Sequence, residues 1–212
     1  MNAALLRLLL LPLLCCAPAT AATALCDEIP DPLRNWAFQS GVAFITDDTA
    51  GNVLLGRTSI AKGPAGGRVY LLSAAYRLGE PTWQLANHTF KPLLELPLTL
   101  AVVDENARSP FLNYATSFQV RWRDLPWNAW LSTTMATGLG LAYSDQIFRM
   151  DHETHAGCYR SHVKFNWPIE LTLALPQFPQ HQLTAFIMHQ SGGCIFDRGG
   201  INNFGFGYRY GL

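Results

Sequence analysis

The chain has 212 residues, and its 15 Lys and Arg residues balance its 15 Asp and Glu residues, so the formal net charge is zero. This balance argues against a phosphate-backbone partner, and we expect no nucleic acid to bind. Only 14% of the residues are charged and 49% are hydrophobic, whereas soluble domains carry about 25% charged residues. The composition therefore favours a membrane β-barrel or a very apolar soluble β-domain.

The N-terminal stretch MNAALLRLLLLPLLCCAPATAATALC has the three regions of a secretory signal. Arg7 precedes a run of leucines, and small residues follow that run, which is the order that export signals share. We expect cleavage after Ala21, with Ala24 as the alternative. Residues 1–21 are then a signal peptide, and 22–212 form a single β-barrel domain.

Beyond this signal, period-2 alternation of apolar and polar residues recurs between Gly, Pro, Asn and Asp, and helical periodicity is nearly absent. The clearest case is VKFNWPIELTLAL, in which Val163, Phe165 and Trp167 share one face and Lys164 and Asn166 share the other. The same pattern predicts strands near 36–46, 66–77, 92–104, 111–123, 129–144, 162–174, 182–192 and 200–211.

These strands are long enough to cross a bilayer, which needs about 9 to 11 residues of tilted strand. An even number of antiparallel strands closes without a free edge. The predicted fold class is therefore all-β, an eight-stranded antiparallel transmembrane β-barrel of the bacterial outer membrane. The long joins after the first and fifth strands then face outward, while GEPTWQLANHTF is too long for a tight turn and has no assignment. The alternative is a soluble periplasmic barrel that binds an apolar ligand inside.

Export leaves three cysteines, Cys26, Cys158 and Cys194, in an oxidising compartment. Cys158 and Cys194 both fall in joins on the outer rim of this strand map. We therefore predict that these two form a disulfide and that Cys26 stays unpaired. The alternative is three buried, reduced thiols.

The last two strands carry a set of residues that suggests chemistry. His189 and Ser191 lie two residues apart in QLTAFIMHQSG and so share a face. In GINNFGFGYRYGL, the aromatic row is expected to face lipid together with Asn202, and Arg209 and the glycines are expected to line the interior. Because consecutive strands pair, an outward His189 would lie beside Asn202.

A hydroxyl, an imidazole and a third group that orients the imidazole are the parts of a serine hydrolase. Backbone N–H groups of Gly192 and Gly193 are candidates for binding the oxyanion, since glycine permits close approach. A site that faces outward near the outer leaflet would meet an ester of a lipid. This chemistry requires no cofactor and no metal.

HQSGG and GGINNFGFGYRYGL resemble the C-terminal strands of the outer-membrane lipid A 3-O-deacylases of the PagL type. That family has a His-aromatic-Ser-Asn-Ala-Gly pattern near the end of the seventh strand and an acid on the eighth. The resemblance implies an eight-stranded barrel that removes the 3-position acyl chain of lipid A in the outer leaflet. Ser191 would be the nucleophile, His189 the base and Asn202 the orienting group.

The chain departs from the family at two positions. Asn202 stands where the family commonly has Glu, and an amide can accept from the imidazole N–H but cannot stabilise the imidazolium by charge. Asp197 in the last join is an alternative acid. Gly192 stands where the family usually has Asn, and losing an oxyanion donor costs about 3 kcal/mol. These departures favour the alternative of a non-catalytic barrel, either a pseudoenzyme or a structural or adhesive protein.

Basic residues are expected in or beside the outer loops, where phosphates of lipopolysaccharide would lie. They are Arg57, Lys62, Arg68, Arg149, Arg160 and Arg198. The alternative is that they are ordinary solvated loop charges. The segment DHETHAGCYRSH invites a metal site, but its spacing matches no zinc-protease pattern, and we predict no metal there.

Overall fold

The computed structural model of the protein describes residues 35–85, 88–123, 125–154, 157 and 159–211. The predicted signal peptide and Cys26 lie outside this part of the chain. None of the helices in the described ranges is both long and apolar enough to span a membrane.

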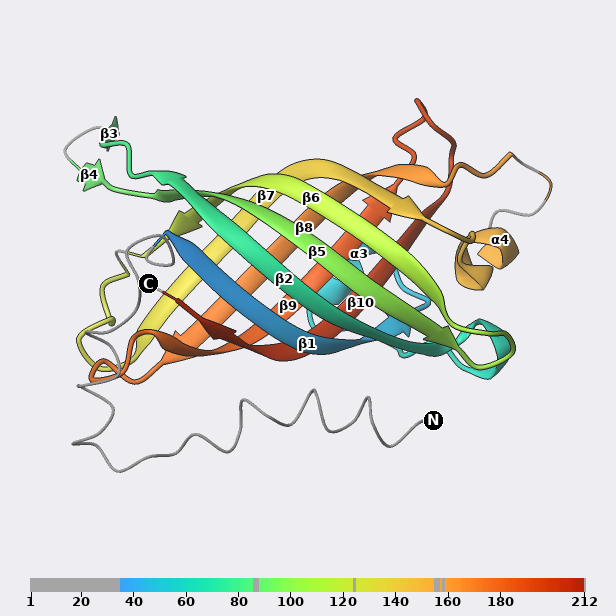
Figure 1. Cartoon of the computed structure of the whole chain (residues 1–212), viewed down its shortest axis with the longest axis horizontal. Helices are drawn as coiled ribbons and strands as arrows, with labels where there is room; N and C mark the ends of the chain where they lie inside the picture. The colour runs from blue at the N-terminus through green and yellow to red at the C-terminus, as the bar shows by residue number, and fades with distance from the viewer. Residues whose placement is uncertain (1–34, 86–87, 124, 155–156, 158, 212) are drawn as a thin grey trace. The chain divides into compact units, whose positions relative to one another are not determined.

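Eight antiparallel strands form a closed barrel in which neighbours in sequence are neighbours in space, and the first strand pairs with the last (Figure 1). The strands are β1 (Trp36–Thr46), β2 (Gly67–Gly79), β5 (Leu93–Glu105), β6 (Phe111–Trp122), β7 (Ser132–Ser144), β8 (Val163–Ala174), β9 (His181–Ser191) and β10 (Gly200–Tyr210). The predicted fold class and all eight predicted strands are confirmed. Closure leaves no unpaired edge to aggregate.

The loops at one rim of the barrel contain short helices, whereas a loop at the opposite rim contains a small hairpin. The β1–β2 join contains α3 (Ala50–Leu54) and η3 (Gly63–Ala65), and the β7–β8 join contains α4 (Arg149–Thr154). Beyond the opposite rim, β3 (Trp83–Leu85) and β4 (His88–Phe90) form a small hairpin (Figure 1). This hairpin accounts for the stretch GEPTWQLANHTF, which the strand pattern leaves unexplained.

The outer surface of the barrel is apolar, as the alternation predicts. Large side chains that are exposed on it include Leu72, Leu98, Leu100, Phe118, Leu139, Leu183 and Phe206. The inward side chains are polar toward the hairpin rim, where Arg121 lies between Glu95 and Glu170. A soluble barrel would show the reverse, so the alternative of an apolar ligand inside a soluble barrel is wrong.

The interior toward the α4 rim holds an apolar cluster beside buried polar side chains such as Asn113, Lys164 and Gln190. Its buried cluster includes Ile45, Val103, Phe148, Met188 and Ile201. Phe148 precedes α4 directly, so this join folds over the mouth of the barrel and packs into it. The filled interior leaves the outer face and the rim as the places where a lipid could bind.

Candidate functional site

The orientation of β9 decides where the candidate catalytic residues point. Alternate residues Gln182, Thr184, Phe186, Met188 and Gln190 are buried in the interior. His189 and Ser191 belong to the other set and are partly exposed on the outer face. The strand register places His189 opposite Asn202, and Ser191 opposite Gly200. His189, Ser191 and Asn202 therefore lie on the outer face, as expected from the pattern of the last strand.

The imidazole of His189 is hydrogen-bonded to the side chain of Asn202. His189 Nδ1 lies 2.7 Å from Asn202 Oδ1, and Asn202 Nδ2 donates to the Asp48 carbonyl oxygen at 2.7 Å. Since the amide nitrogen must donate to that carbonyl, Oδ1 faces the imidazole as an acceptor, and Nδ1 carries the hydrogen. This tautomer leaves the Nε2 lone pair of His189 free to take a proton.

Trp167 packs against His189 from the neighbouring strand. The two residues pair across β8 and β9, and their ring centroids lie 5.9 Å apart with the planes perpendicular, at 89°. The Trp167 indole N–H donates to Thr137 Oγ1 at 2.9 Å, which fixes the indole in turn. Trp167 thus limits rotation of the imidazole and covers one side of it. The alternation in the sequence predicts that Trp167 faces outward, but it does not predict the register between β8 and β9 that pairs Trp167 with His189.

A groove of about 400 Å³ opens beside Ser191 and His189. Its lining includes Thr46, Asp47, Asp48, Thr49, Met150, Thr154, Arg198, Ile201 and Asn202. The backbone N–H of Ser59 donates to the Asp48 carboxylate and holds the pKa of Asp48 below its ordinary value. The groove thus has a negative charge at Asp48 and a positive charge at the exposed Arg198.

The backbone N–H groups of Gly192 and Gly193, the two candidates for binding the oxyanion, differ in whether they already donate a hydrogen bond. The Gly192 N–H donates to the Gly199 carbonyl oxygen at 2.9 Å, so this amide already has an acceptor within its own turn. Gly193 is exposed, with a φ of 59°, and none of the described residues accepts a hydrogen bond from its N–H. Ser191 Oγ likewise has no hydrogen-bond partner within the described ranges.

Asp197, the alternative acid, does not approach His189. It is buried, accepts from the Ser161 N–H at 2.7 Å, and lies 2.6 Å from Lys164 Nζ. Burial alone would raise the pKa of Asp197, but hydrogen bonds from Lys164 and from the N–H groups of Ser161 and Gly199 hold it below its ordinary value. Asp197 is therefore an ionised partner of Lys164, because a buried ammonium needs a counter-charge.

The remaining predicted features of the outer loops fall in three groups. Cys194 is exposed with a free thiol, and Cys158 lies outside the described residues, so their disulfide stays a prediction. No group of three or more His, Cys, Asp or Glu residues in the described ranges is arranged to hold a metal ion. Of the basic residues expected at the rim, Arg160 is buried beside Asp151.

The chain matches no known family model and no curated protein. Among solved structures, it is similar to the outer membrane enzyme PagL, with 11% identity, a TM-score of 0.55, and coverage of 82% of this chain and 99% of that one. Neisserial surface protein A gives 12% identity and a TM-score of 0.46, with 84% and 96% coverage. The N-terminal β-barrel domain of Pseudomonas aeruginosa OprF gives 11% and 0.39, with 84% and 98% coverage.

At these identities the likeness to PagL shows the fold alone. That fold is an eight-stranded barrel, and here it carries an apolar outer face around a polar and filled interior. The two observations together place the chain in a bacterial outer membrane, in contact with lipid.

Proposed function

We propose that this outer-membrane barrel is an esterase that removes an ester-linked acyl chain, at the 3-position, from lipid A. One observation carries the proposal: His189 is held by Asn202 in the tautomer of a general base, on the outer face that it shares with Ser191. The outer face of such a barrel meets lipid, and its rim lies at the level where the acyl esters of a lipid join the headgroup. Resemblance of the C-terminal stretches to the PagL-type deacylases supports the same substrate.

In the proposed reaction, Ser191 Oγ attacks the ester carbonyl while His189 Nε2 takes the hydroxyl proton. The tetrahedral intermediate collapses when the bond between the acyl carbon and the ester oxygen of the sugar breaks. His189 then gives the proton to that oxygen, which leaves as the sugar hydroxyl. Water then attacks the acyl-Ser191 ester, with His189 again as the base, and releases the fatty acid. Such nucleophile–base hydrogen bonds often tighten only when substrate binds, so an unbonded Ser191 is compatible with this role.

Asn202 performs two tasks in this scheme. Its carbonyl oxygen accepts from His189 Nδ1, and its amide nitrogen binds the Asp48 carbonyl in the first outer loop. A carboxylate at this position would accept from the imidazole but would face the Asp48 carbonyl without a hydrogen to donate. The contact with Asp48 therefore supplies a physical reason for an amide in place of the family's acid.

The proposal is tested by mass spectrometry of lipid A from Gram-negative cells that express the wild type or Ser191→Ala at matched outer-membrane abundance. We expect the wild type alone to remove one hydroxyacyl chain from lipid A, because the variant lacks the attacking hydroxyl. Intact lipid A in both strains, with both barrels folded, would contradict the proposal.

A second candidate function is a non-catalytic barrel with a structural or adhesive role. Two observations favour it: the Gly192 amide is used within its own turn, and the group that orients His189 is neutral. Intact lipid A in the mass-spectrometric comparison is the result that this candidate predicts.

Gly192→Asn, which restores the residue usual in the family, is expected to lower deacylation about 100-fold rather than raise it. A Cβ at Gly192 would lie 2.0 Å from Asp197 Oδ1 and 2.4 Å from the Asp197 carbonyl oxygen, so the turn after Ser191 must move. A displacement of about 1 Å at a reacting group is enough for such a loss. The initial rate on purified lipid A in detergent micelles measures the effect.

Gly51→Ala is the matched control for Gly192→Asn. Its added Cβ would meet only Thr49 Oγ1, at 4.0 Å, in the first outer loop. We expect this variant to keep the wild-type rate. An increase of the rate in Gly192→Asn would mean that the turn yields and that the new amide serves the oxyanion.

A further inference from the structure

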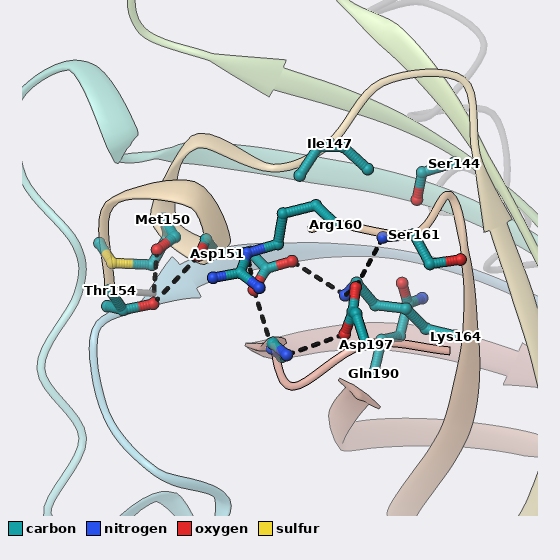
Figure 2. Close-up of polar contacts among 12 residues, drawn as sticks. Ser144, Ile147, Met150, Asp151, Thr154, Arg160, Ser161, Lys164, Gln190 and Asp197 are labelled. Carbon is teal, nitrogen blue, oxygen red and sulfur yellow. Dashed lines mark hydrogen bonds and ion pairs between the residues drawn. The ribbon is translucent and has the colours of Figure 1, made fainter. Parts of the chain in front are cut away.

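A buried ionic cluster at the mouth of the barrel joins three segments that are far apart in the sequence (Figure 2). Asp151 comes from α4, Lys164 from β8 and Asp197 from the β9–β10 turn, and all three are buried. Lys164 Nζ lies 2.9 Å from Asp151 Oδ2 and 2.6 Å from Asp197 Oδ2. One ammonium is thus shared by two carboxylates, and the buried Arg160, with Nε 3.7 Å from Asp151 Oδ1, balances the second negative charge. Removing any one member leaves an uncompensated buried charge.

Both carboxylates also bind the backbone where the turn after Ser191 meets β10. Asp151 Oδ1 accepts the Gly200 N–H at 2.9 Å, and Asp197 Oδ1 accepts the Gly199 N–H at 2.8 Å. Gly200 is the residue that pairs with Ser191 across the two strands. A side chain from α4 therefore holds the residue directly opposite the candidate nucleophile.

The approach of Asp151 to the turn depends on a missing side chain. A Cβ at Gly199 would lie 2.1 Å from Asp151 Oδ1. The same helix supplies Met150 and Thr154 to the groove at Ser191 on the outer side. The cluster therefore connects α4 to the turn, and each of these two segments supplies part of the lining of the groove.

We propose that Asp151, Lys164 and Asp197 form a clamp of positioning residues, which fixes the turn 192–199 and thereby the placement of Ser191 and of the Gly193 N–H relative to His189. The proposal rests on the proposed esterase function. None of the three side chains touches the substrate, since all three are buried and none of them lines the groove. Their effect on the reaction is exerted through the backbone of the turn, where a shift of about 1 Å costs about 100-fold in rate.

The test uses the full-length barrel, purified in detergent micelles, with lipid A as the substrate. Asp151→Ala is expected to lower kcat about 100-fold with KM changed less than about 3-fold, because the nucleophile shifts while the groove remains. Asp151→Asn keeps an oxygen for the Gly200 N–H and is expected to recover at least about tenfold of that loss. Glu153→Ala, an exposed carboxylate on the same helix, is the control and should keep the wild-type rate.

Two further measurements separate positioning from general damage. Hydrogen exchange of the Gly200 amide should become faster in Asp151→Ala and stay slow in Asp151→Asn, while the heat-modifiable gel mobility of the barrel is unchanged. Should Asp151→Ala fail to fold, Asp151→Ala/Arg160→Met removes one charge of each sign, and Lys164 keeps its pair with Asp197. The same loss of kcat is expected in that variant.

The outcomes distinguish the clamp from the proposed function. A wild type that deacylates lipid A, together with an Asp151→Ala variant of equal kcat, would overturn the clamp alone. Equal loss of kcat in Asp151→Asn and Asp151→Ala, with the Gly200 amide still protected, would also overturn it. A folded wild type without activity would overturn the esterase proposal, and the catalytic role of the clamp with it.

Discussion

His189→Ala is expected to lower kcat on lipid A by at least about 1000-fold, the size of effect that loss of a positioned general base produces. The imidazole is the only titratable side chain that lines the groove on the same strand as Ser191, and its Nδ1 is already bound to Asn202. Without Nε2, β9 offers no base beside Ser191 to take the hydroxyl proton as it attacks. The purified barrel, assayed for released fatty acid in detergent micelles, gives kcat directly.

Trp167→Phe is the control for this prediction. It keeps an aromatic ring against the imidazole and removes only the indole N–H that binds Thr137. We expect its kcat to stay within about tenfold of the wild type, since one neutral hydrogen bond contributes about 1 kcal/mol. A His189→Ala variant as active as Trp167→Phe would show that the imidazole is not the base.

The outer pattern of the barrel is readable from the sequence because one face of each strand meets lipid. In Val163–Ala174 this alternation is nearly complete, and the predicted strand differs from the observed one by a single residue. β9 is different, because its inward residues Phe186 and Met188 pack in the buried apolar cluster of the interior. Apolar residues on both faces hide the orientation of His189. The orientation of His189 follows from the pairing of β9 with β10, because β10 has its aromatic residues on one face and its glycines on the other.

The contacts around the candidate site depend on residues that are distant in the chain, and local patterns do not report them. Asp197 is a reasonable alternative acid from its position after Ser191, but its partner is Lys164, which a different strand supplies. The contact of Asn202 with Asp48 uses a backbone carbonyl, which carries no residue-type signal. The sequence therefore predicts which side chains share the outer face, while their partners require the folded barrel.

Arg121→Met is expected to lower the free energy of unfolding by about 3–5 kcal/mol, the largest effect on stability that we predict. The guanidinium is buried, with Nε 2.9 Å from Glu95 Oε2, Nη2 2.7 Å from Glu170 Oε2 and Nη1 3.0 Å from Thr134 Oγ1. Arg209 also pairs with Glu95, so the intact group of two acids and two arginines is neutral. Methionine leaves two buried carboxylates with one arginine. Urea unfolding in detergent micelles, followed by tryptophan fluorescence, measures the change.

Arg123→Met, two residues along the chain, is the control for the interior group. Its pair with Glu80 is partly exposed, with the two side chains 32% and 27% accessible, and such pairs contribute less than about 1 kcal/mol. Equal losses of unfolding free energy in the two arginine variants would mean that the interior carboxylates are protonated or hydrated and need no arginine.

Because Arg121 lies toward the hairpin rim and His189 toward the α4 rim, folded Arg121→Met should retain the wild-type kcat. A variant that is unstable yet active would separate what holds the barrel together from what reacts on its surface.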